Sequence, residues 1–231
     1  MPDNDIAQNL RQVRTQIELD ALKAGRDPEE ITLLAVSKRK SAETIRQAYA
    51  AGQRDFGENY LQEAEQKMLA LEDLDLVWHF IGPIQSNKTR AIAENFDWVH
   101  SVDRIKIARR LSQQRPQHLP PLNICLQINI DDEQSKSGAG VDEAEELAQQ
   151  ISQMPNLCLR GLMCIPNKVE STTLNQDHAF VRLDQLYQQL KNKAGLQQLD
   201  TLSMGMSDDM QAAIAAGSTI VRIGTAIFGA R

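Results

Sequence analysis

The sequence has 231 residues, of which 42% are hydrophobic and 24% are charged, which is typical of one soluble globular domain and unlike a disordered segment. Its 25 Lys and Arg residues are outnumbered by 31 Asp and Glu residues, and the net charge of −6 disfavours a broad nucleic-acid surface. No apolar run approaches the roughly 20 residues that cross a bilayer. The opening residues also lack the pattern of a signal peptide, so we expect a cytoplasmic protein.

Eight short apolar segments alternate with longer amphipathic segments along the chain. The short segments are rich in β-branched or aromatic residues and are bounded by Gly, Pro, Asn or Asp, a pattern that predicts strands. In chain order the predicted strands are 31–38, 54–59, 76–82, 97–103, 123–130, 157–166, 200–205 and 218–224.

Helical spacing is found between these strands. Ser41, followed by Glu43, is expected to cap one helix, and Ser207 is expected to open an alanine-rich helix that ends at Gly217. The clearest predicted helices are 5–24, 41–51, 141–154 and 174–193.

Strand–helix alternation predicts an α/β fold with a parallel sheet covered by helices. Eight units in this length fit a closed (β/α)8 barrel of the TIM type, whose usual size is about 250 residues. We therefore expect a single barrel domain over residues 1–231, and the alternative is an open doubly wound sheet. No helix is predicted after the last strand, so the segment 5–24 is expected to cover that gap.

The three cysteines lie inside apolar runs and lack the short paired spacing of a zinc site. We therefore expect Cys125, Cys158 and Cys164 to be reduced thiols of the core. No metal site is predicted.

In a barrel of this type the functional residues lie at the C-terminal ends of the strands, often with a phosphate held after the seventh and eighth. The N–H groups of a helix that opens at Ser207 suit a phosphate, and Gly224 and Thr225 add a close backbone approach and a hydroxyl. The alternative is that Ser207 is only a helix cap, which is the more common role of such a serine, and the neighbouring Asp208 and Asp209 would repel an anion unless they point away. These residues alone leave both interpretations open.

A lysine and an arginine share this end of the predicted barrel. Lys38 is either an ordinary solvated lysine or an amine held in a partly desolvated pocket, where it is a nucleophile toward an aldehyde. Arg222 lies in an apolar strand and needs a partner, because a buried unpaired charge is very costly. It could donate a hydrogen bond to a pyridine nitrogen. With the phosphate-binding turn, these two side chains suggest a site for pyridoxal 5′-phosphate.

Seven motifs, spread in order over essentially the whole chain, resemble the pyridoxal phosphate homeostasis protein family. That family is similar in fold to the N-terminal barrel of alanine racemases. The motifs are AVSK at 35–38, FGENY at 56–60, WHFIGPIQSNK at 78–88, SKSG at 135–138, RGLM at 160–163, LSMGMSDDM at 202–210 and VRIGTAIFG at 221–229.

This resemblance implies that Lys38 binds pyridoxal 5′-phosphate covalently, as an aldimine. It implies that Ser207, Thr225 and the backbone of Gly224 hold the phosphate and that Arg222 faces the ring nitrogen. An arginine at that position leaves the ring nitrogen unprotonated, so the cofactor is a poorer electron sink and carbanion chemistry is disfavoured.

Further residues are expected near the cofactor on the same ground. Lys136, in the polar loop after the fifth strand, is a possible secondary contact, and a solvated loop lysine is the alternative. Four other residues are expected either to line the pocket or to pack in the barrel: Asn59, His79, Met163 and Ser203.

Two functions from different classes follow from the resemblance. The first is a non-catalytic carrier that buffers, stores and delivers pyridoxal phosphate, with transient contacts to apo-enzymes. The second is an amino-acid racemase, which needs a second base, and in the resembling racemases this is a tyrosine from a separate C-terminal domain of the partner subunit. Tyr60 is the lone tyrosine expected at the mouth.

The sequence ends at Arg231, directly after the predicted barrel, so we expect a carrier and a monomer. A third alternative is a barrel that lacks the cofactor and binds another phosphorylated metabolite.

Overall fold

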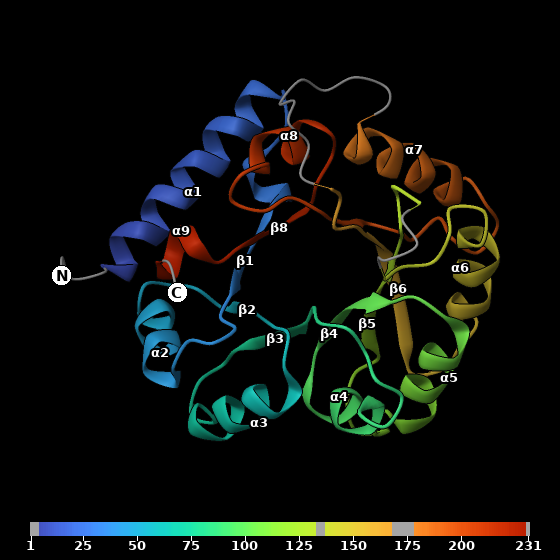
Figure 1. Cartoon of the computed structure of the whole chain (residues 1–231), viewed down its shortest axis with the longest axis horizontal. Coiled ribbons are helices and arrows are strands. Elements are labelled where there is room, and N and C mark those ends of the chain that lie inside the picture. The colour runs from blue at the N-terminus through green and yellow to red at the C-terminus, as the bar shows by residue number, and fades with distance from the viewer. Residues whose placement is uncertain (1–4, 133–136, 168–177, 230–231) are drawn as a thin grey trace.

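The computed structural model of the chain describes residues 5–132, 137–167 and 178–229. Its strands form a closed parallel barrel in which each strand pairs with its sequence neighbour and the first pairs with the last (Figure 1). The register of that last pair places Leu34 opposite Arg222, which excludes the open sheet and confirms the predicted (β/α)8 fold. The strands are β1 (Thr32–Val36), β2 (Asp55–Glu58), β3 (Val77–Phe80), β4 (Trp98–Val102), β5 (Leu122–Gln127), β6 (Leu157–Met163), β7 (Thr201–Ser203) and β8 (Ile220–Ile223).

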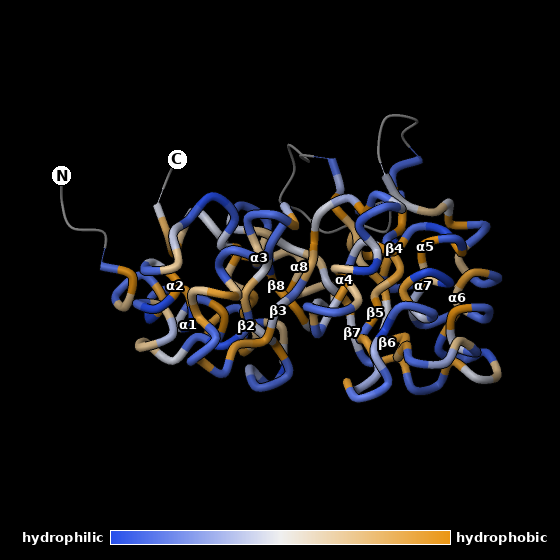
Figure 2. The backbone as a smooth tube through the Cα atoms, turned by 90° about the horizontal axis from the view of Figure 1, so that it is seen from below, coloured by the Kyte–Doolittle hydropathy of each residue, from blue (hydrophilic) through white to orange (hydrophobic). Residues whose placement is uncertain are grey.

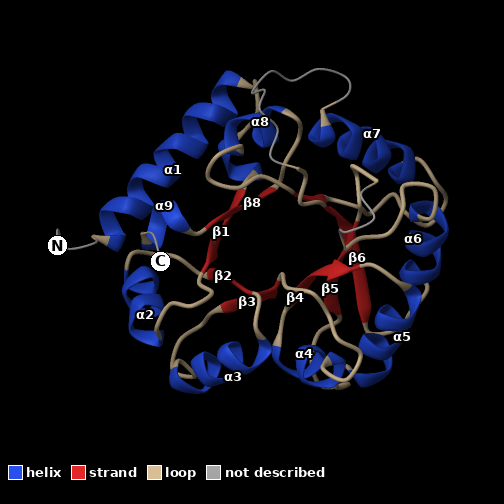
Figure 3. Cartoon of the chain, in the orientation of Figure 1, coloured by secondary structure: helices blue, strands red, loops and turns tan. Residues whose placement is uncertain are grey.

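Helices form a ring outside the strands (Figure 3). Within the described ranges, no helix has the length and apolar character needed to span a bilayer. The helices are α1 (Ile6–Lys23), the 3-10 helix η1 (Pro28–Glu30), α2 (Ala42–Ala50), α3 (Leu61–Ala70), α4 (Thr89–Asn95), α5 (Ile105–Gln114), α6 (Ala144–Ser152), α7 (Ala179–Lys191), α8 (Met210–Ala215) and α9 (Thr225–Phe228).

The helix that follows β7 differs from the prediction at its start. It begins at Met210 rather than at Ser207, and Asp209 is its N-cap residue. The carboxylate of Asp209 accepts a hydrogen bond from the N–H of Met206, 2.5 Å away, so the residues between them form a turn instead of the first turn of a helix. By contrast, Ser41 caps α2 as predicted, accepting from the N–H of Thr44.

The last strand is followed by a short helix, α9, which the sequence did not predict. Helix α1 packs against both α8 and α9, as expected for a segment that covers the gap in the helical ring (Figure 1). Asn9 of α1 donates to the carbonyl of Ile227, and Arg26 donates to the carbonyls of Ile214 and Ser218. The first and last parts of the chain therefore close the barrel together.

Apolar residues fill two separate regions. The larger core lies between the strands and the helices, and in Figure 2 the hydrophobic stretches lie mostly inside the outer hydrophilic turns. A second, small cluster of Leu34, Ile81 and Ile220 lies apart from that core. Buried His79 and His100 occupy neighbouring strands and contact each other, so polar side chains are also part of the barrel.

The cysteines, all within the described ranges, are thiols, and Cys125 and Cys164 are fully buried as expected. Cys158 is half-buried at the start of β6. Burial raises the pKa of Cys125 to about 12, and the thiolate is the reactive form of cysteine. We therefore expect iodoacetamide at pH 8 to modify Cys158 well before Cys125, as followed by peptide mass spectrometry. In urea, all three should react at similar rates, and equal rates in the folded chain would contradict this assignment.

Candidate functional site

A cavity of about 560 Å³ opens at the C-terminal ends of the strands. Val36, Ile81 and Ile165 supply apolar parts of its wall. The cavity brings together six residues that the sequence singled out: Lys38, Asn59, Ser207, Arg222, Gly224 and Thr225. These residues come from the segments that follow β1, β2, β7 and β8 and from β8 itself.

Lys38 lies in the turn that follows β1 and is half-buried. Within the described part of the chain, no side chain or backbone oxygen accepts a hydrogen bond from its Nζ. The next residue, Arg39, has a φ of 62°, a left-handed conformation that is uncommon for a residue other than glycine. This turn needs outside support to hold that conformation.

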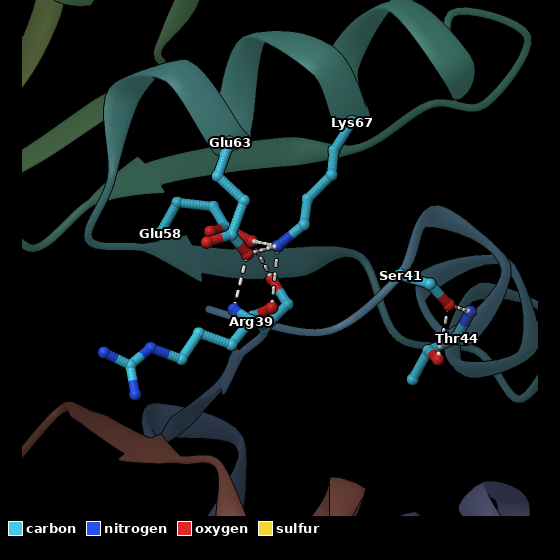
Figure 4. Close-up of polar contacts among 7 residues, drawn as sticks. Arg39, Ser41, Thr44, Glu58, Glu63 and Lys67 are labelled. Carbon is cyan, nitrogen blue, oxygen red and sulfur yellow. Dashed lines mark hydrogen bonds and ion pairs between the residues drawn. The ribbon is translucent and has the colours of Figure 1, made fainter. Parts of the chain in front are cut away.

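The support comes from a group that we call the acid–lysine clamp: Glu58, Glu63 and Lys67. Figure 4 shows these three side chains pointing toward one another and toward the backbone of Arg39. Nζ of Lys67 lies 2.7 Å from Oε1 of Glu58 and 2.5 Å from Oε1 of Glu63. It also donates to the carbonyl of Ser37, 2.8 Å away.

The clamp holds the residues on both sides of Lys38. The hydroxyl of Ser37 donates to Glu58 at 2.6 Å, and the backbone N–H of Arg39 donates to Glu63. Glu58 is fully buried, and this burial raises its pKa, although the charge of Lys67 opposes the rise. The clamp therefore fixes the direction in which the turn presents Lys38.

Arg222 lies on β8 and is 5% exposed. Its Nη1 donates to the carbonyl and the hydroxyl of Ser203, at 2.6 and 2.9 Å, and its Nη2 donates to the carbonyl of Cys164 at 2.9 Å. Burial lowers its pKa. These acceptors are neutral, so none of them cancels the positive charge that Arg222 brings to the cavity wall.

Two backbone turns complete the mouth. Gly205 has a φ of +95°, and a Cβ there would lie 2.5 Å from that of Ala213, so this turn requires glycine. Ser207 follows in the same loop and is exposed. On the other side, α9 begins directly after Gly224, so the N–H groups of Thr225 and Ala226 have no acceptor within that helix. Hydroxyl and N–H donors from both turns therefore line the same cavity.

The chain was compared with known proteins. The family model described as the alanine racemase N-terminal domain matches residues 4–231. The pyridoxal phosphate homeostasis protein of Pseudomonas aeruginosa is 59% identical over 226 residues, which cover 98% of this chain and 96% of that protein. Its namesake from Escherichia coli K12 is 56% identical, over 99% of this chain and 97% of that one.

The chain belongs to the pyridoxal phosphate homeostasis protein family. This confirms the resemblance found in the seven motifs.

Solved structures agree with this assignment. The structure of PipY from Synechococcus elongatus with PLP bound has a TM-score of 0.85 and 38% identity, covering 97% of this chain and 100% of that one. Alanine racemase from Corynebacterium glutamicum, at 19% identity and a TM-score of 0.69, shows a shared fold, and the match covers 98% of this chain and 61% of the racemase.

Three of the four residues that were expected either to line the pocket or to pack in the barrel are buried and are not among the described residues that line the cavity. His79 and Ser203 are buried and take part in hydrogen bonds inside the barrel, where Ser203 accepts from Arg222. Met163, at the end of β6, is fully buried. Lys136 lies outside the described residues. Tyr60 lies in an adjoining cavity, where its hydroxyl is 3.4 Å from Nη2 of Arg39.

Other residues that support the site had no predicted role. Glu58 lies in a predicted strand and Lys67 lies on the next helix, and a glutamate in a buried strand followed by such a lysine is an available signal for an ion pair. His100, which lies 2.8 Å from the hydroxyl of Ser203, was missed because it reads as one polar residue in an ordinary alternating strand.

Proposed function

We propose that this chain binds pyridoxal 5′-phosphate and serves its homeostasis by buffering, storing and delivering it, as one barrel domain over residues 1–231. The main observation in support of this function is that Lys38, Arg222 and the donors around Ser207 and Thr225 line a single cavity. PipY, with PLP bound in its solved structure, and the relatives named for pyridoxal phosphate homeostasis support this function.

The residues present fit this cofactor. Oδ1 of Asn59, in the same cavity wall, is buried and has no hydrogen-bond partner in the described part of the chain, and a ligand that carries a donor would satisfy it. The cofactor supplies an aldehyde that bonds reversibly to amines. Lys38 would hold that aldehyde carbon, Arg222 would donate toward the ring nitrogen, and Ser207, Gly224 and Thr225 would hold the phosphate.

We further propose that the chain is a carrier and not an enzyme. A racemase needs two bases on opposite faces of the substrate. The described residues that line the cavity include no tyrosine and no histidine, and Asp208 is their one carboxylate, at an exposed position. The arginine partner for the ring nitrogen also disfavours carbanion chemistry. We propose a cytoplasmic monomer that contacts apo-enzymes transiently.

Replacing Lys38 should abolish covalent binding of the cofactor. Wild-type protein incubated with pyridoxal phosphate, reduced with borohydride and digested should carry the adduct on Lys38, whereas Lys38→Ala and Lys38→Arg should carry none there. Lys88→Ala is the matched control, because Lys88 lines the adjoining cavity, and it should keep the adduct. A wild-type adduct on another lysine, or no adduct, would overturn the proposed site.

A separate measurement distinguishes a carrier from a racemase. The loaded protein is incubated with L-alanine and with D-alanine in deuterated water, and α-proton exchange is followed by NMR. A carrier should leave both enantiomers unchanged. Rapid exchange with inversion would show that the chain is a racemase.

A further inference from the structure

Five side chains on five strands form a continuous series of hydrogen bonds across the barrel. Beginning at the cavity, Nη1 of Arg222 lies 2.9 Å from Oγ of Ser203, which lies 2.8 Å from Nδ1 of His100. Nε2 of His100 lies 2.9 Å from Nδ1 of His79, whose Nε2 lies 3.1 Å from Oδ1 of Asp55. These hydrogen bonds connect β8, β7, β4, β3 and β2.

The residues at the two ends of this series determine the donor-to-acceptor direction of its hydrogen bonds. The guanidinium of Arg222 can only donate, and the carboxylate of Asp55 can only accept. Ser203 accepts from Arg222, and its one proton is left to donate to Nδ1 of His100. Nε2–H of His100 then donates to Nδ1 of His79, and Nε2–H of His79 donates to Asp55.

The burial of the two histidines preserves this order of donors and acceptors. His100 is fully buried, and this burial, together with His79 and Arg222, holds its pKa well below the usual range, so the ring is neutral and has one N–H. The ring of His79 is 1% exposed and stacks on Trp98 at a centroid distance of 5.4 Å. If the bonds were reversed, a His79 ring with a single N–H would donate it to His100 and turn a lone pair toward the carboxylate of Asp55. A buried polar network in which every group has its partner is rigid.

The Asp55 end of this series lies away from the mouth of the cavity. Asp55 is the first residue of β2, and its side chain is 29% exposed. It lines a different cavity, together with Thr32 at the start of β1 and Glu29. The N-terminal and C-terminal ends of parallel strands lie at opposite ends of a barrel. Two separate surfaces of the molecule are thus connected by one set of hydrogen bonds.

We propose that this series of hydrogen bonds is a directional relay. In it, Asp55, His79 and His100 position Arg222 for its ligand and couple the cofactor cavity to the opposite end of the barrel. The relay rests on the proposed function, because it assumes that the ring nitrogen of pyridoxal phosphate meets Arg222. Asp55, His79 and His100 are positioning residues, since they reach the cavity only through Ser203.

The order of the protons is tested first, without any cofactor. Long-range proton–nitrogen NMR of the chain labelled with ¹⁵N-histidine, at pH 8, should show both His79 and His100 with the proton on Nε2. Resonances are assigned with single His→Gln variants. A proton on Nδ1 of either ring would overturn the relay.

The coupling is tested next. Pyridoxal phosphate added to the wild type should shift the imidazole signals of His100 and His79, while the exposed His118 should not respond. Asp55→Ala should weaken the affinity for pyridoxal phosphate about 2- to 30-fold, the range for residues of a coupling network. Glu29→Ala, which removes another carboxylate from the same far cavity, should leave the affinity unchanged.

The two proposals fail in different ways. If the wild type does not bind pyridoxal phosphate, the proposed function fails, and the cofactor-free spectra still test the order of the relay. If the wild type binds but Asp55→Ala and Glu29→Ala have the same affinity as the wild type, the relay is wrong and the function stands. Should Asp55→Ala fail to fold, Asp55→Asn, which keeps an acceptor but not the charge, takes its place with a smaller expected loss.

Discussion

Replacing Lys67 by Met is expected to destabilise the fold by about 3–5 kcal/mol at neutral pH, because it leaves the buried carboxylate of Glu58 without its counter-charge. Glu58 is fully buried, and its Oε2 has no hydrogen-bond partner among the described residues. The neutral hydroxyl of Ser37, which donates to Oε1, does not replace the charge of the lost ammonium. The loss is measured by urea unfolding at pH 7.5.

The effect should depend on pH in one direction. Burial raises the pKa of Glu58 above its usual value of 4.5, with Lys67 opposing that rise. A pKa that is higher in the folded chain means that the folded chain holds the proton more tightly, so stability falls as the pH rises from 4.5 through the folded-state value. Without Lys67 that value rises further. The deficit of Lys67→Met should therefore shrink as the pH is lowered toward 4.5.

Two further variants separate this mechanism from a simple loss of packing. Glu58→Gln combined with Lys67→Met should recover part of the lost stability, because the amide carries no charge. Arg46→Met is the matched control, since Arg46 pairs with Asp73 at an exposed position, where salt bridges contribute little. Equal losses for Lys67→Met and Arg46→Met, with no dependence on pH, would contradict the role given to the clamp.

Gly161→Ala is the second change with a large expected effect, a loss of about 4 kcal/mol or more. A Cβ on Gly161 would lie 1.7 Å from the backbone carbonyl oxygen of Thr201. These two residues pair in the register of β6 and β7, so the collision cannot be relieved without separating the strands. We expect a large decrease in the urea midpoint or a failure to fold.

Gly57→Ala is the matched control, because it makes the same change in another strand of the barrel. Its Cβ would lie 3.2 Å from Cδ1 of Ile81 and 3.4 Å from Leu34, both side-chain atoms that can move. Overpacking of this kind costs about 1–3 kcal/mol. If Gly161→Ala is as stable as Gly57→Ala, the strand pairing around Gly161 is more tolerant than its geometry indicates.

The fold was predictable because most barrel strands are short apolar runs between turn residues, and the count of eight favoured a closed barrel over an open sheet. The ends of the elements were less predictable. The strand predicted for 31–38 ends at Val36, because Ser37 is held by the clamp and Arg39 turns the chain. The helix expected from Ser207 begins at Met210, because the carboxylate of Asp209 bonds to the turn before it.

The candidate site was predictable in part for a different reason. Lys38, Arg222 and Thr225 are near the C-terminal ends of their strands, and a parallel barrel gathers those ends at one mouth. The depth of a side chain below that mouth depends on strand tilt and register, which a single sequence does not show. The sequence therefore left open whether His79 lines the pocket or packs in the barrel, and the structure places it buried in the barrel, bonded to His100.

Closure by the two ends of the chain bears on synthesis of the protein. One edge of strand β1 forms its hydrogen bonds with β8, and α1 packs on α9. Residues near the N-terminus therefore complete their contacts only when β8 and α9 are present. A nascent chain on the ribosome therefore cannot build the cavity until the segment through Phe228 has left the exit tunnel. Closure of the barrel therefore follows the emergence of β8 and α9, and the cavity at the ends of the strands forms only after that closure.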